Sequence, residues 1–122
     1  MRPRLVSENN MKLFYIPGAC SLATHIILLE VGATFDIEEV DTNTAKTKSG
    51  LDYKTINRKG SVPALELNSG EILTEGASIL QYIADQHINC NLAPESGTIA
   101  RARLQEYLNY TSSELHKAFS PF

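Results

Sequence analysis

Hydrophobic positions in the first third of the chain switch between two spacings. Lys12–Ile16 is a short β-prone run that a Pro-Gly pair stops. Ala19–Val31 is rich in Leu, Ile and Ala, and Gly32 follows where a helix C-cap is expected. Phe35–Val40 then has partly alternating polarity, as in a second strand. The pattern predicts a strand–helix–strand unit with parallel pairing and a right-handed crossover.

The middle of the chain indicates a hairpin. Asp41–Gly50 is polar and is expected to be a loop, and Leu51–Asn57 fits a short helix. Two strands, Val62–Leu67 and Glu71–Thr74, are joined by Asn-Ser-Gly, and a short glycine-containing connection favours antiparallel pairing.

Helical spacing returns after the hairpin. Ala77–His87 carries apolar residues on one face, whereas Ile88–Gly97 contains a proline and no periodicity, as in a linker. Thr98–Phe119 reads as a long helix. Its apolar stripe consists of Leu104, Leu108, Leu115 and Phe119. No sequence follows that could cover this stripe, so the helix resembles the first part of a larger helical unit.

The order of these elements predicts an α/β fold with a thioredoxin-like domain (βαβ-α-ββα), followed by the start of an all-helical domain. We expect residues 1–10 to be a disordered extension and residues 11–87 to form the thioredoxin-like domain. Residues 88–97 would be the linker, and residues 98–122 the first helix of a truncated helical domain.

Composition narrows the possible partners. Of the 122 residues, 43% are hydrophobic and 20% are charged, with a net charge of −3 and no basic block, which argues against a nucleic-acid partner. No apolar run approaches the roughly 20 residues of a membrane span. The opening MRPRLVSENN lacks the apolar core of an export signal. The two cysteines fit neither a metal site nor a disulfide framework, so we expect a cytoplasmic protein without a metal.

Candidate chemistry gathers at the start of the first predicted helix. Cys20 would lie where free backbone N–H groups and the helix dipole favour a thiolate, either its own or a bound one. Ala23 excludes a C-x-x-C dithiol, and a buried structural thiol is the alternative. Tyr15 and Ser21 could donate hydrogen bonds to a sulfur anion, while His25 follows one turn after Ser21.

Three other positions are ambiguous from the residues alone. The Val62–Pro63 step could be cis and turn the backbone toward an extended ligand, although trans is the commoner form. Glu75, in a Thr-Glu-Gly string before a helix, could receive a ligand ammonium group or simply cap the helix. His116 and Lys117 could belong to a site or to a solvated helix surface.

The order of these motifs resembles the bacterial (beta-class) glutathione transferases. The resemblance runs from Met11 to Phe122. It is carried by the strings MKLFYIPGACSLATHI, NRKGSVPALEL, EILTEGASILQYIAD and EYLNYTSSELHKAFSPF. It implies a glutathione-binding thioredoxin-like domain followed by a helical domain, in a protein that is usually a homodimer.

The resemblance also implies roles for single residues. Cys20 matches a cysteine that contacts the glutathione sulfur and can form a mixed disulfide with it. Tyr15 and Ser21 match nearby hydroxyl positions that are candidates for catalysis, and His25 matches a histidine close to that site.

Further matched positions concern the rest of the tripeptide. The Val62–Pro63 step, with a cis bond, would pair with the cysteinyl part, and Glu75 and Gly76 would receive the γ-glutamyl end. His116 and Lys117 match positions that approach the cysteine region, which makes His116 a catalytic candidate and both residues candidates for binding.

The chain departs from the family pattern at two sites and in length. Relatives often have lysine where Ala45 stands, although Lys46 is adjacent, and many have glutamine where Ser61 stands. If the shorter Ser61 side chain makes one hydrogen bond fewer to the ligand, binding weakens by on the order of 1 kcal/mol. Relatives also continue for several more helices, which form much of the pocket for the electrophilic co-substrate.

The expected function is glutathione transfer: binding glutathione and activating its thiol for conjugation to a small electrophile or for thiol–disulfide exchange. A non-catalytic glutathione-binding module, left by truncation of the helical domain, is the alternative. A glutaredoxin-like reductase fits less well, because the linker and long helix are typical of a transferase.

Overall fold

The computed structural model describes residues 10–18 and 21–111. Its elements in chain order are β1 (Met11–Tyr15), α1 (Ser21–Glu30), β2 (Phe35–Asp41), β3 (Lys46–Thr47), α2 (Tyr53–Ile56), β4 (Ala64–Glu66), β5 (Ile72–Thr74), α3 (Gly76–Gln86), the 3₁₀ turn η1 (Ile88–Cys90) and α4 (Ile99–Tyr110). Every predicted strand and helix is present in the predicted order, with β3 and η1 in addition, and the thioredoxin-like fold class is confirmed.

The strands form one mixed sheet in the order β3-β2-β1-β4-β5. Leu13 in β1 is the centre of the register: it pairs in parallel with Ile37 of β2 and antiparallel with Leu65 of β4. Leu65 in turn pairs antiparallel with Leu73 of β5. Both predicted pairings, the parallel first pair and the antiparallel hairpin, are therefore confirmed.

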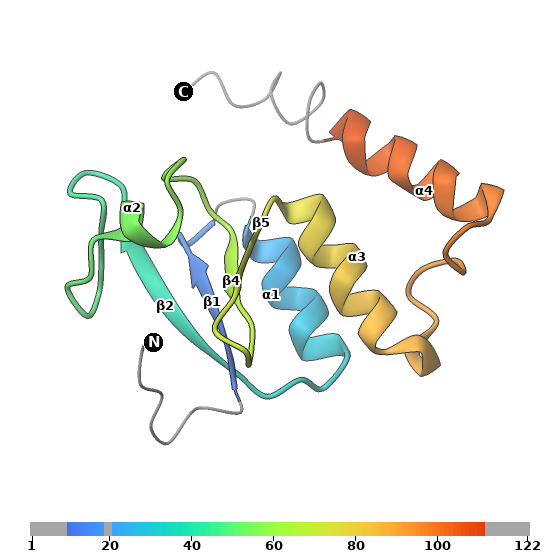
Figure 1. Ribbon diagram of the computed structural model, residues 1–122, viewed down its shortest axis with the longest axis horizontal. Helices are drawn as coiled ribbons and strands as arrows, with labels where there is room; N and C mark the ends of the chain where they lie inside the picture. The colour runs from blue at the N-terminus through green and yellow to red at the C-terminus, as the bar shows by residue number, and fades with distance from the viewer. Residues whose placement is uncertain (1–9, 19–20, 112–122) are drawn as a thin grey trace.

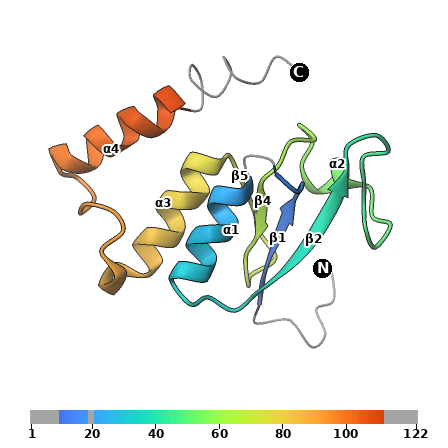
Figure 2. The same cartoon turned by 180° about the vertical axis from the view of Figure 1, so that it is seen from behind.

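Helices cover both faces of the sheet, with α1 and α3 side by side on one face and α2 on the other (Figures 1 and 2). Successive strand residues point to opposite faces, so neighbours in β1 enter different cores. The core beneath α1 and α3 consists of Leu13, Leu28, Leu65, Ile79 and Ile83. The core beneath α2 consists of Phe14, Val40, Tyr53 and Ala64.

The C-terminal end of α1 has the glycine cap that the sequence predicted. Gly32 has a φ of 72°, a left-handed conformation that glycine adopts without a steric penalty. The backbone N–H of Ala33 donates to the carbonyl of Leu28 at 3.1 Å, and that of Gly32 donates to Leu29 at 3.1 Å. These bonds satisfy the last carbonyls of the helix. The first two residues of the predicted helix, 19 and 20, lie outside the described residues.

The prediction of a loop over Asp41–Gly50 is wrong in part, because Lys46 and Thr47 form β3 against β2. A buried carboxylate anchors this segment. Glu38 accepts hydrogen bonds from the Ser49 backbone N–H and hydroxyl and from Lys12 Nζ at 3.1 Å. Burial raises the pKa of Glu38, but hydrogen bonds from Ser49, Thr47 and Lys12 outweigh it and lower the pKa to about 2. No local pattern in the polar segment reveals these long-range partners.

The predicted linker contains η1, which sequence periodicity did not indicate. The following helix, α4, begins after Thr98, whose Oγ1 accepts a hydrogen bond from the Arg101 backbone N–H at 3.1 Å. Leu104 and Leu108 of the predicted stripe are half-buried. Leu115 and Phe119 lie outside the described residues.

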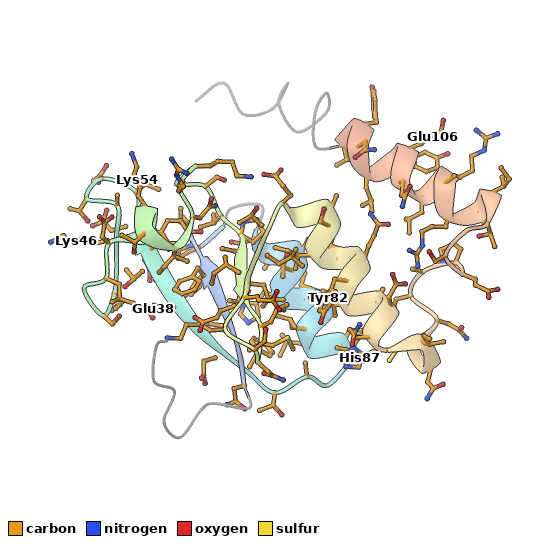
Figure 3. All side chains as sticks on the ribbon, in the orientation of Figure 1. Glu38, Lys46, Lys54, Tyr82, His87 and Glu106 are labelled. Atoms are coloured by element: carbon orange, nitrogen blue, oxygen red, sulfur yellow. The ribbon has the colours of Figure 1, made fainter. Side chains whose placement is uncertain are left out.

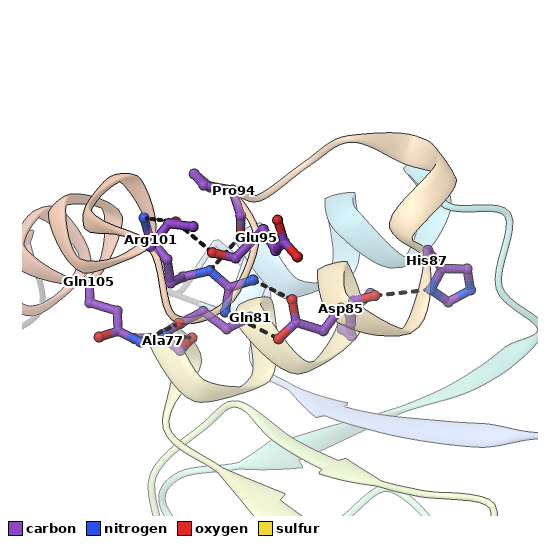
Figure 4. A network of polar contacts seen from close by, with 10 residues as sticks. Ala77, Gln81, Asp85, His87, Pro94, Glu95, Arg101 and Gln105 are labelled. Carbon is purple, nitrogen blue, oxygen red and sulfur yellow. Dashed lines mark hydrogen bonds and ion pairs between the residues drawn. The ribbon is translucent and has the colours of Figure 1, made fainter.

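A polar network joins α4 to α3 (Figure 4). The Arg101 side chain is only 6% exposed and makes a two-pronged ion pair with Asp85, in which the Nη1–Oδ2 distance is 3.2 Å. Its Nε donates to the carbonyl of Pro94 at 2.9 Å, and Gln105 Nε2 donates to Gln81 Oε1 at 3.0 Å. The network thereby fixes the start of α4 on α3.

In the parts of the chain that the structure describes, no helix is long and apolar enough to cross a membrane.

Candidate functional site

A pocket of about 570 Å³ lies beside the starts of α1 and α3 and reaches α4. Most of its lining side chains are apolar, and the polar ones come from α1, the segment before β4, the residue that precedes α3 and the C-terminal end of α4. The lining residues are Leu22, Ala23, Thr24, Ile26, Ser61, Val62, Pro63, Glu75, Gly76, Ala77, Leu80, Leu108 and Thr111. The pocket brings together five predicted binding residues: Ser61, Val62, Pro63, Glu75 and Gly76.

A tight turn over residues 57–61 sets the position of the pocket wall. The Ser61 carbonyl accepts hydrogen bonds from Tyr53 Oη at 2.7 Å and from Asn57 Nδ2 at 2.8 Å. Asn57 also accepts two hydrogen bonds within the turn. Its backbone carbonyl accepts from the Gly60 N–H at 2.9 Å, and its side-chain Oδ1 accepts from the Lys59 N–H at 3.2 Å. Tyr53 is fully buried, and its burial raises the pKa of the phenol, so the donor stays protonated.

The peptide bond between Val62 and Pro63 is cis. This agrees with what the family resemblance implied, whereas the residues alone favoured the trans form. Pro63 is buried and Val62 half-buried, and both line the pocket immediately before β4.

Glu75 stands at the N-cap position of α3 but does not cap the helix with its side chain. Its carboxylate forms an ion pair with Lys59 Nζ, which also lies 3.4 Å from Thr74 Oγ1. The Lys59 and Glu75 side chains are 55% and 64% exposed. Glu75 has a φ of 74°, an uncommon conformation for a residue with a side chain. The interpretation of Glu75 as a side-chain cap is therefore wrong, and its carboxylate is instead paired with Lys59 beside the pocket.

A second, smaller cavity of about 130 Å³ brings together Tyr15, Ser21 and His25. Ser21 is buried, and its Oγ lies 3.3 Å from both the N and the O of Ile16, accepting from the first and donating to the second. The His25 ring contacts the ring of Tyr15 at a centroid distance of 6.3 Å and the ring of Phe35, edge-on, at 5.7 Å. The predicted hydroxyl positions thus do lie together beside the N-terminus of α1.

Three predicted site residues, Cys20, His116 and Lys117, lie outside the described residues. Lys46 follows Ala45, the position where relatives often have lysine. It is exposed on β3, at the end of the molecule that carries α2 and on the opposite side from α4 (Figure 3). Among residues 10–18 and 21–111, no group of three or more His, Cys, Asp or Glu side chains could hold a metal ion.

Sequence reasoning missed the residues that support this site. Tyr53 and Asn57 hold the turn, and Lys59 pairs with the pocket carboxylate. An asparagine three residues before a glycine is a turn signal and could have located the turn. Nothing local indicates the Lys59–Glu75 pair, because its two members are far apart in the chain. The resulting pocket, with mostly apolar walls and the ion-paired Glu75 carboxylate among its lining residues, suits a ligand that carries a charged group.

Known proteins resemble this chain in sequence and in fold. Residues 9–85 match the family described as "Glutathione S-transferase, N-terminal domain". The chain is 49% identical over 111 residues to glutathione S-transferase GstA of Escherichia coli O157:H7, a match that covers 91% of this chain and 55% of that protein. The chain spans about half the length of the curated relatives it matches.

Solved structures of glutathione S-transferases also resemble this chain. A beta-class glutathione S-transferase of Sphingomonas chungbukensis superposes with a TM-score of 0.88 at 53% identity, covering 91% of this chain and 57% of that one. A sphingomonad glutathione S-transferase complexed with glutathione superposes with a TM-score of 0.87 at 54% identity, covering 90% and 55%. The family match covers more than half of the chain, and the fold and pocket agree with it: the chain belongs to the glutathione S-transferase N-terminal domain family.

Proposed function

We propose that this chain binds glutathione in the pocket beside α1 and α3 and activates its thiol. The observation that carries the proposal is the convergence of Ser61, the Val62–Pro63 step and the α3 start on one pocket. The cysteinyl backbone would pair with Val62, and the γ-glutamyl head group would bind at Glu75 and Gly76. The structure of a 54% identical relative complexed with glutathione supports this choice of ligand.

The sulfur would lie at the start of α1, where the free N–H groups of a helix stabilise an anion. This stabilisation lowers the thiol pKa, and the thiol proton passes to solvent. In conjugation, the thiolate donates an electron pair to an electrophilic carbon, so that a C–S bond forms while the leaving group departs with the electrons of its own bond. Tyr15 and Ser21 are the hydroxyls proposed to donate to the sulfur, and Ser21 would do so by giving up its bond to the Ile16 carbonyl.

Cys20 supplies a second reaction, thiol–disulfide exchange. Its thiolate would attack one sulfur of oxidised glutathione, forming a mixed disulfide and releasing one glutathione thiolate. His116 and Lys117 are proposed to act on the same region from the helical segment, His116 in catalysis and both in binding.

Other parts of the proposal concern the whole protein. We propose residues 11–87 as the glutathione domain, 88–97 as the linker and 98–122 as the start of a helical domain. We also propose that the whole protein is a homodimer in the cytoplasm. Its role would be detoxification by conjugation of glutathione to small electrophiles. Leu22, Ile26, Leu80 and Leu108 give the pocket the apolar wall that an electrophile would need.

Mass spectrometry after incubation with oxidised glutathione tests the assignment of Cys20. We expect one glutathione adduct on the unaltered chain, none on Cys20→Ala, and an unchanged adduct on Cys90→Ala. Cys90 is the matched control, because it is exposed on η1 and is not among the residues that line the pocket. An adduct that persists in Cys20→Ala would contradict the assignment.

A conjugation assay with an activated aryl halide separates the enzyme from a binding module. Glutathione-dependent product formation that depends on Glu75 supports the enzyme. Saturable glutathione binding without turnover would support the non-catalytic alternative.

A further inference from the structure

The ion pair between Lys59 and Glu75 has a consequence for the head group that this pocket accepts. Glu75 lines the pocket, yet its carboxylate is paired with the Lys59 ammonium. A ligand ammonium that binds Glu75 must therefore displace or share that lysine. A displaced lysine that finds no new negative partner loses its attraction to Glu75, which offsets part of what the ligand gains.

The position of Lys59 is set by the protein and not by chance contact alone. Its backbone N–H donates to Asn57 Oδ1 at 3.2 Å, in the turn that Asn57 and Tyr53 fix through the Ser61 carbonyl. Its Nζ also lies 3.4 Å from Thr74 Oγ1, so the ammonium bridges the last residue of β5 and the N-cap residue of α3. The turn thus places one positive charge beside the negative charge of Glu75, which lines the pocket.

The pair is also easy to exchange. Both side chains are more than half exposed, so solvent screens their attraction and leaves a small net stabilisation. An α-amino acid head group carries an ammonium and a carboxylate on one carbon. It could give the ammonium to Glu75 and the carboxylate to Lys59, replacing one ion pair by two.

We propose that Lys59 is a specificity-determining residue that forms an ion pair with the α-carboxylate of the γ-glutamyl head group, while Glu75 forms one with its ammonium. This inference rests on the proposed glutathione function and adds the requirement for a zwitterion. A tripeptide with only the ammonium would have to compete with Lys59 and offer it nothing in return.

Titration calorimetry with two tripeptides tests this assignment. Glutathione carries both charges, whereas 4-aminobutyryl-cysteinylglycine lacks only the α-carboxylate. We expect the unaltered chain to bind glutathione about fivefold more tightly than the analogue, as for an exposed charge pair. In Lys59→Met, glutathione should bind about fivefold more weakly, while the analogue binds with unchanged or greater affinity.

Lys54→Met is the matched control. Lys54 lies on α2, and its Cε lies 3.5 Å from where a Cβ on Gly60 would be, so the substitution removes a charge beside the same turn without touching Glu75. It should change the affinity for both tripeptides by the same factor. Thermal unfolding checks that each variant is folded.

Three results would overturn the inference: equal weakening of both tripeptides in Lys59→Met, no change for glutathione, or tighter glutathione binding, which would make Lys59 a competitor. If the unaltered chain does not bind glutathione at all, the proposed function fails as well. Binding that is independent of Lys59 removes this inference alone.

Discussion

Two cation–carboxylate pairs at the two ends of α3 differ in burial and, we infer, in purpose. At the C-terminal part of α3, Asp85 holds Arg101, whose side chain is 6% exposed and also binds a backbone carbonyl. At the N-terminal end, Glu75 holds Lys59, and both side chains are more than half exposed. The first pair connects α4 to α3, while the second lies at a pocket.

The difference shows how similar chemistry can serve structure or recognition. A buried guanidinium needs its partners at all times, because an unpaired buried charge is strongly destabilising. An exposed ammonium loses little when its partner changes, since water solvates it in between. Glu38 extends the first class, because its carboxylate is buried and is held by Ser49 and Lys12.

The largest expected effect comes from Glu38→Gln. The pKa of Glu38 is lowered to about 2 from 4.5, so this carboxylate stabilises the folded chain above pH 4.5. That contribution is lost as the pH falls from 4.5 toward 2, because the proton binds the unfolded chain more readily. We expect the variant to lose about 3 kcal/mol at pH 7.

Urea unfolding of both proteins from pH 7 to pH 2 checks this prediction. The stability difference between them should shrink through the acidic range. A difference that stays constant with pH would show that the Glu38 charge has no special role.

Removing either member of the α3–α4 pair should have unequal effects. Asp85→Ala leaves a buried guanidinium without its carboxylate, whereas Arg101→Met leaves an Asp85 that is 44% exposed and can be hydrated. We expect the thermal midpoint to fall by about 5–10 °C in Asp85→Ala and by less in Arg101→Met. Differential scanning calorimetry measures both, and the reverse order would contradict the burial argument.

Tyr53→Phe should have a moderate effect. It removes the hydrogen bond to the Ser61 carbonyl, but that carbonyl keeps its bond from Asn57 Nδ2 at 2.8 Å. We expect a loss of about 1 kcal/mol in the free energy of unfolding, measured in urea, with weaker glutathione binding from a looser turn. Unchanged binding would mean that the turn does not position the pocket wall.

The smallest effect on stability should come from Glu75→Gln. The exposed pair is worth less than about 1 kcal/mol, so the urea midpoint should hardly move. Glutathione affinity should nevertheless fall severalfold, because the ammonium loses its charged partner. A variant that is destabilised as much as Asp85→Ala would place this pair in the structural class.

The sequence predicts the fold well because its signals are local. Periodicity and the glycine after α1 indicate β1, α1, β2 and the β4–β5 hairpin, each of which depends on residues close together in the chain. The two-residue β3 was missed, because it is a polar edge strand held in place by pairing with β2 and by the bonds from Ser49 to Glu38 of that same strand.

The candidate site was predictable only in part. Motif order located the Val62–Pro63 step and Glu75, which the structure brings to one pocket. The Lys59–Glu75 and Asp85–Arg101 pairs each join residues far apart in the chain, in different elements, and no periodic pattern encodes such contacts. They follow only from the packing of the elements.

Glutathione titration followed by amide NMR of the isotope-labelled chain tests the central claim most directly. We predict saturable shifts at Val62, Glu75 and Gly76, with the signals of Glu38, Asp85 and Arg101 left in place. The absence of saturable shifts, or the largest shifts at the α3–α4 junction, would contradict a glutathione site in this pocket.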